Sequence, residues 1–138
     1  MSNMLRLLCV VLFLSGAFGC TAYPAPRNAN FVHVVLFKFP KGLEPPKARE
    51  FLADIRDDLI PIPTVDALWI GRPAPTRSPD RPMVDTNYDF GMVLLFADQK
   101  SLQQYLDHPD HVAFAKKWDT VAEVRVFDFK PYQEGEEP

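Results

Sequence analysis

The segment Phe31 to Phe39 is apolar on both of the faces that a β-strand would present, and this most constrains the fold. Side chains alternate between the two faces of a strand. One face carries His33, Val35, Phe37 and Phe39, and the other carries Val32, Val34 and Leu36. A strand that is apolar on both faces is buried on both. In a chain of 138 residues the helices of one domain can cover only one face, so we expect the other to meet a partner subunit.

The first part of the chain has the pattern of an export signal. Arg6 precedes an apolar run over residues 7–14, which is too short to span a bilayer, and small residues follow. The run ends at Ala17-Phe18-Gly19-Cys20, which resembles a bacterial lipobox, in which the cysteine is lipidated. We expect residues 1–20 to be a signal peptide and Cys20 to attach the chain to a membrane through a lipid. Plain secretion and an uncleaved anchor are the alternatives; in each case the protein is exported to the bacterial cell envelope or periplasm.

The segments that flank the expected domain are short. Residues 21–30 contain two prolines and are typical of a tether, and residues 133–138 form an acidic tail. The only cysteines are Cys9 and Cys20, so after processing no free thiol remains for metal binding or nucleophilic catalysis. The net charge of −3 argues against a nucleic-acid partner, because nucleic-acid binders usually present a basic face.

Beyond the first strand, the pattern predicts a helix, two strands, an interrupted helix and a last strand. Pro45 and Pro46 suit a first helical turn, and Asp98 suits an N-cap. His108-Pro109 interrupts the second helix, because the residue before a proline disfavours helical geometry. The expected helices cover residues 45–59, 98–106 and 110–118, and the expected strands cover residues 65–71, 88–96 and 121–129.

This order, βαββαβ, is that of the ferredoxin-like motif, an α+β fold. It predicts one antiparallel sheet with helices on one face, and a homodimer in which two sheets pack into an α+β barrel. Between the two middle strands, Arg72 to Val84 is rich in proline and arginine, which favours a solvated loop. The alternative for this segment is a site for an anion or a lipid headgroup.

The three histidines lie in two places, His33 in the first strand and His108 and His111 around the helix break. If the helices cover the face that carries His33, then His33, Tyr105 and His111 can meet in one pocket. A neutral histidine accepts a proton and a tyrosine donates one, so we expect His111 to be a base and Tyr105 an acid. We also expect the helix N-terminus to keep the His111 ring neutral, because it disfavours a positive charge.

Each of these residues also has a purely structural interpretation. His33 can be a hydrogen-bonded core residue, His108 an N-cap, and Tyr105 a packed ring with its hydroxyl in water. No acidic residue belongs clearly to the cluster, and we expect no metal site and no cofactor.

Two segments stand out, His33-Val-Val-Leu-Phe-Lys-Phe and Tyr105-Leu-Asp-His-Pro-Asp-His-Val-Ala-Phe, and the domain ends with Val126-Phe-Asp-Phe-Lys-Pro. The two segments resemble those of the stress-responsive A/B barrel (Dabb) family, and the ending is similar to the last strand of that family. The resemblance covers residues 31–132 and implies a dimeric α+β barrel. A plant member closes a ring in a linear polyketide by an aldol-type reaction without a cofactor. Its catalytic pair corresponds to Tyr105 and His111; its pocket histidine and phenylalanine correspond to His33 and Phe51, and a pocket tyrosine is replaced here by Ile55.

From these residues we expect a binding protein for a small apolar molecule, held between the sheet and the helices. The expected ligand-binding residues are His33, Val35, Phe37, Phe51, Ile55 and His108. One alternative is a cofactor-free cyclase or lyase that acts on a carbonyl substrate through Tyr105 and His111. The other is a structural protein of the envelope. The haem or oxygen chemistry of other dimeric α+β barrels also stays open.

Overall fold

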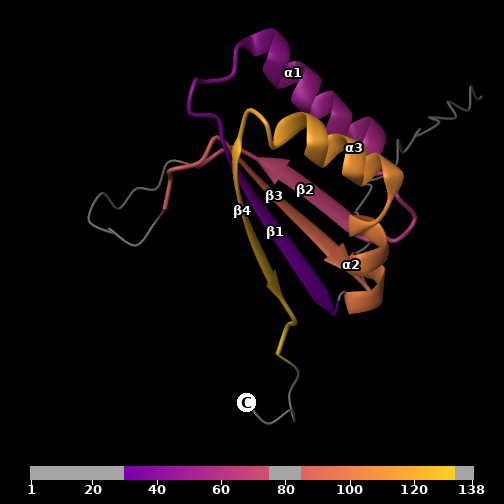
Figure 1. Ribbon diagram of the computed structural model, residues 1–138. Helices are drawn as coiled ribbons and strands as arrows, with labels where there is room; N and C mark the ends of the chain where they lie inside the picture. Colours follow the sequence, from indigo (N-terminus) through magenta and orange to yellow (C-terminus); the bar gives the residue numbers. More distant parts are fainter. Residues whose placement is uncertain (1–29, 75–84, 133–138) are drawn as a thin grey trace, which may run out of the picture.

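The computed structural model describes residues 30–74 and 85–132, which form a four-stranded antiparallel sheet and helices packed against it (Figure 1). The strands follow each other across the sheet in the order β2-β3-β1-β4. This is the predicted ferredoxin-like α+β arrangement. The elements are β1 (Phe31–Lys38), α1 (Pro45–Asp54), η1 (Ile55–Leu59), β2 (Ala67–Gly71), β3 (Phe90–Phe96), α2 (Gln99–Leu106), α3 (Pro109–Trp118) and β4 (Glu123–Phe129).

Several predictions concern segments outside the described residues. These are the signal peptide with Cys20, the tether up to residue 29, residues 75–84 of the proline- and arginine-rich segment, and the tail over residues 133–138. Of that segment, Arg72 is described, and its guanidinium stacks 4.4 Å from the centroid of the Phe90 ring. No helix within the described ranges is both long and apolar enough to cross a membrane.

The helix boundaries follow from local chemistry. Asp98 accepts a hydrogen bond from the Ser101 backbone N–H (2.7 Å), which caps α2. His108 is the N-cap of α3 and its Nδ1 accepts from the Asp110 N–H (3.3 Å), while Pro109 occupies the first turn. The predicted break between the two helical pieces is therefore confirmed.

The first helix differs from the expected continuous α-helix over residues 45–59. From Ile55 to Leu59 it continues as a π-helix, with a hydrogen bond of 3.1 Å from the Ile60 N–H to the Ile55 carbonyl. Ile55 and Leu59, at the two ends of this segment, are both buried in the core.

The helices cover the sheet face that carries His33, which is the condition under which His33, Tyr105 and His111 can meet in one pocket. Phe37 contacts Phe51 of α1 (ring centroids 5.0 Å apart) and Phe114 of α3 (6.3 Å), and His33 contacts Tyr105 of α2 (6.0 Å). Register confirms the alternation, because His33, Val35 and Phe37 pair with Leu94, Met92 and Phe90 of β3, all buried.

The opposite face of the sheet is apolar, and none of the described helices packs on it. Its centre is Val34, which pairs with Val93 of β3 and Phe127 of β4. Trp69, Phe127 and Phe129 on this face are about half exposed, at 53%, 50% and 50%. Large aromatic side chains gathered on one open face mark an interaction surface. We call this surface the open sheet face.

Candidate functional site

A cavity of about 220 Å³ lies between the sheet and helices α2 and α3. Most of its wall is apolar, and two histidine rings lie beside Tyr105. The structure thus brings together His33, Tyr105 and His111, which the sequence analysis expected to share one pocket. The lining residues are His33, Val35, Phe37, Met92, Tyr105, Leu106, His111, Phe114, Ala115, Asp119, Val124, Val126 and Asp128.

His33 has an acidic partner that the sequence analysis missed. The side chain of His33 is buried, and its Nδ1–H donates to Oδ1 of Asp128 at 2.5 Å. The two residues lie directly opposite each other in the β1–β4 register. The expectation that no acidic residue belongs to the cluster is therefore wrong. One signal was present, since an aspartate inside a strand is unfavourable and Asp128 alternates with two cavity residues, Val124 and Val126.

Tyr105 stands between the two histidine rings. It comes from the last turn of α2 and is buried, with its ring 6.0 Å from His33 and 4.5 Å from His111. Burial raises the pKa of Tyr105 above its ordinary value, because a phenolate is poorly solvated there. Within the part of the chain that the structure describes, its hydroxyl has no hydrogen-bond partner. Tyr105 is therefore a protonated donor available to a ligand.

His111 is held in one orientation by the neighbouring helix. Its Nδ1–H donates to the backbone carbonyl of Leu106 at 3.0 Å, which leaves the lone pair on Nε2. Burial lowers the pKa of His111 more than the Leu106 carbonyl and Asp119 raise it, and charge on His33 or His108 would lower it further. The direction agrees with the expectation of a neutral ring, but the main cause is burial rather than the helix N-terminus.

Three of the expected ligand-binding residues lie away from this cavity. Phe51 and Ile55 are closed into the core, where Phe51 contacts Phe37, Phe90 and Trp118. Phe51 contacts the rings of Phe37 and Phe114, which line the cavity, but does not line it itself. His108 caps α3 from outside the cavity, as its structural interpretation predicted. Val35 and Phe37 do line the cavity.

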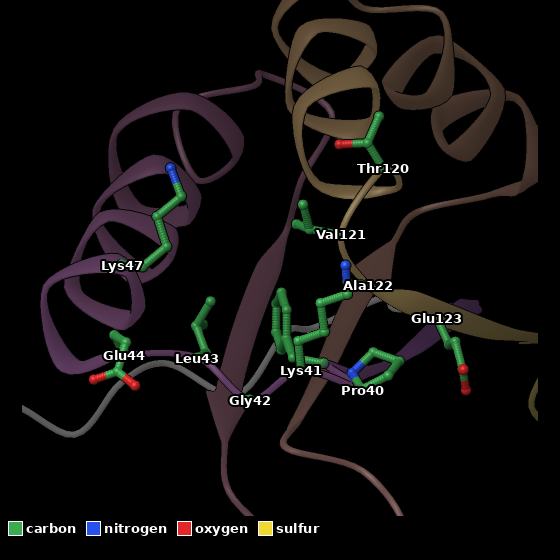
Figure 2. A pocket seen from close by; sticks show the side chains of 11 residues that line it. Pro40, Lys41, Gly42, Leu43, Glu44, Lys47, Thr120, Val121, Ala122 and Glu123 are labelled. Atoms are coloured by element: carbon green, nitrogen blue, oxygen red, sulfur yellow. The ribbon is translucent and has the colours of Figure 1, made fainter.

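A second and larger cavity, of about 490 Å³, opens where β1 leads into α1 (Figure 2). Residues 40–44 form one side of it and residues 120–123 the other, with Leu43 and Val121 turned towards each other (Figure 2). Gly42 makes the turn on one side, with a φ of +73°. The sequence analysis did not identify this cavity, and none of the three histidines lines it. Within the described residues, no group of three or more histidine, cysteine or acidic side chains is arranged to hold a metal ion.

A family model and a solved structure relate this chain to the same family. The family model described as the stress responsive A/B barrel domain (Dabb) matches residues 31–131. A Dabb family protein of Mesorhizobium loti with a ferredoxin-like fold is similar at 28% identity and a TM-score of 0.61, over 75% of this chain and 97% of that chain. No curated protein gives a significant match.

More distant structures share the fold. A dimeric ferredoxin-like protein of unknown function from Thermobifida fusca is 20% identical, with a TM-score of 0.60, over 76% of this chain and 93% of that chain. The hydroxynitrile lyase of Passiflora edulis is 15% identical, with a TM-score of 0.64, over 80% of this chain and 99% of that chain. Identities this low support a common fold and nothing finer.

Proposed function

Because the chain belongs to the stress responsive A/B barrel (Dabb) family, we propose that its domain is a homodimeric binding module for a small, mainly apolar molecule. The ligand lies in the cavity between the sheet and helices α2 and α3. One observation carries this proposal: Tyr105 and His111 present a hydroxyl and a ring nitrogen, neither of them paired with another described residue, to a space whose other walls are mostly apolar. An apolar pocket with a few convergent polar groups is the usual form of a small-molecule site.

The homodimer is supported by the open sheet face. Its exposed aromatic residues, Trp69, Phe127 and Phe129, would leave water if two sheets packed face to face. The Thermobifida fusca protein of the same fold is dimeric. A second copy also satisfies the physical requirement of β1, whose two apolar faces both need cover.

Binding can be tested with a variant whose larger side chain on α3 fills the cavity. Ala115 lines the cavity and Ala113 is exposed on the same helix, so Ala115→Phe and Ala113→Phe form a matched pair. We expect a neutral aromatic ketone, 2-acetylnaphthalene, to shift the backbone amide NMR signals around Tyr105 in the wild type and in Ala113→Phe. Ala115→Phe should lose this response. Absence of any shift in the folded wild type, or an unchanged response in Ala115→Phe, would overturn the proposal.

A second candidate function is cofactor-free proton transfer on a carbonyl compound, favoured by the orientation of His111. Nε2 of His111 would take a proton from the carbon beside a carbonyl, and the C–H electron pair would form an enolate. Tyr105 would stabilise the enolate oxygen as a hydrogen-bond donor, since its raised pKa keeps the hydroxyl protonated. Loss of deuterium exchange at the α-carbon of a bound ketone in His111→Gln, with binding retained, would support this chemistry. Equal exchange in both proteins would refute it.

We further propose that the domain is held at the bacterial cell envelope by a lipid on Cys20. The support is the sequence alone, namely the apolar run and the lipobox-like ending at residues 17–20. In a bacterial host, the wild type should carry a diacylglyceryl mass on Cys20 and fractionate with membranes, whereas Cys20→Ser should not. An unmodified Cys20 in the exported protein would reject lipidation.

A further inference from the structure

We propose that the cavity selects uncharged ligands over anionic ligands of the same shape, and that Asp119 and Asp128 impose this selectivity. The inference rests on the proposed binding function and narrows its ligand class to neutral ketones, aldehydes and phenols.

The formally charged side chains on the cavity wall are both acidic. Asp119 and Asp128 line it, and no lysine or arginine is among its described lining residues. Asp119 is also the C-cap of α3, so it lies at the end of the helix where backbone carbonyls concentrate partial negative charge. An anion in the cavity would therefore meet negative potential from β4 and from the end of α3.

Of the cations on or directly after these elements, two are engaged in ion pairs, and the others, Lys116 and Lys130, do not line the cavity. Lys117 of α3 is paired with Asp54 (2.6 Å) and with Glu50 (2.8 Å). Arg125 of β4 is paired with Asp85 at 2.8 Å, and its register partner Leu36 places it on the open sheet face. Neither cation lines the cavity, and neither can neutralise an anionic ligand without first giving up its own ion pair.

His111 does not supply the missing positive charge at neutral pH. Burial lowers the pKa of His111, so its ring is neutral. Nδ1–H of His33 donates to Asp128, so this donor is not available to a ligand. The groups that face a ligand include a hydroxyl donor on Tyr105 and the lone pair on Nε2 of His111.

These groups define the ligand class. A ketone or aldehyde oxygen accepts from Tyr105, and a hydroxyl group donates to Nε2 of His111. A carboxylate or phosphate needs several donors or a cation, and would face like charge at close range. The volume of about 220 Å³ is smaller than the ~300–1,000 Å³ typical of drug-sized ligands, so the ligand is small.

The experiment compares two ligands of nearly the same shape, 2-acetylnaphthalene and 2-naphthoate, at neutral pH. Both are titrated into the full folded domain and followed by NMR. The wild type should bind the ketone at least about tenfold more tightly than the carboxylate, because like charges oppose the second ligand. In Asp119→Asn, and in the double variant with Asp128→Asn, we expect the ratio of the two affinities to fall by at least about threefold per substitution, because like-charge repulsion of the carboxylate is reduced. Asparagine keeps an oxygen that can accept from His33.

The control is Asp110→Asn, because Asp110 lies in the first turn of the same helix and outside the cavity wall. Its ligand ratio should equal that of the wild type. Equal affinity for both ligands in the wild type, or an unchanged ratio in Asp119→Asn, would overturn the selectivity and leave the binding function standing. Binding of neither ligand to the folded wild type would overturn both. If Asp128→Asn fails to fold, Asp119→Asn alone decides the matter.

Discussion

Nδ1 of His111 lies 3.0 Å from the carbonyl oxygen of Leu106, across the break that Pro109 makes between α2 and α3. The hydrogen bond joins the first turn of one helix to the last residue of the other. It satisfies a carbonyl that α2 leaves without a helical partner, and it fixes which ring nitrogen faces the cavity. The break between α2 and α3 thus fixes the orientation of His111, the candidate base.

We predict that His111 titrates below the ordinary histidine value of 6.5, because burial disfavours its charged form. The folded state then binds fewer protons than the unfolded state between the two pKa values. The free energy of unfolding should consequently rise with pH in that window and lose this contribution as the pH falls through the folded pKa. NMR titration of the ring signals measures the pKa, and urea unfolding at several pH values measures the slope.

The control for this titration is His111→Gln. It should remove the part of the pH dependence that lies just below 6.5 and leave the loss of stability at more acidic pH. That loss comes from carboxylates such as Asp98, whose pKa is lowered by the Ser101 backbone hydrogen bond and whose contribution is lost only at lower pH. A His111 pKa above 6.5 would contradict the prediction.

The pair of His33 and Asp128 should contribute to stability. Asp128→Ala strands the Nδ1–H of the buried His33, and such an unpaired buried group costs about 1–3 kcal/mol. Asp128→Asn keeps an acceptor and should cost less. Chemical denaturation of the three proteins measures the difference. Equal stability of Asp128→Ala and the wild type would show that the hydrogen bond is not formed in solution.

Tyr105→Phe separates the ring from the hydroxyl. The ring packs against Phe96 and His111, and phenylalanine keeps these contacts. Since the hydroxyl has no partner among the described residues, its removal should change the melting temperature little or raise it. Affinity for a neutral ketone should fall about tenfold, the loss of about one good hydrogen bond. A clearly lower melting temperature would indicate that the hydroxyl serves the structure instead.

The open sheet face should control the association of two copies. Phe127→Glu places a charge where an apolar contact is expected, so the variant should be monomeric in analytical ultracentrifugation while the wild type is a dimer. Ile60→Glu is the matched control, since Ile60 is also about half exposed (47%) but lies beyond η1 and outside the sheet. A dimeric Phe127→Glu would place the interface elsewhere.

Local sequence pattern determined where the strands and helices of this protein lie in the chain. The alternation in β1, the cap at Asp98 and the break at Pro109 depend on neighbours a few residues away, so strands and helices are predictable from the printed residues. The same alternation placed His33, Val35 and Phe37 on one face. Tyr105 and His111 lie close together in the chain, on either side of the helix break. The cavity residues that come from β1, α2 and α3 could therefore be predicted from the sequence.

The tertiary structure determined which residues from distant segments meet and which are enclosed in the core. Asp128 reaches His33 from 95 residues away, and only the β1–β4 register places it there. Phe51 looked like a pocket residue, but the packing of α1 encloses it among aromatic rings. The physical reason is that strand register and helix packing depend on burying many side chains at once, which no short stretch of sequence encodes. The sequence by itself thus determined the elements and the face of each side chain, and tertiary packing determined which of those faces enclose a cavity.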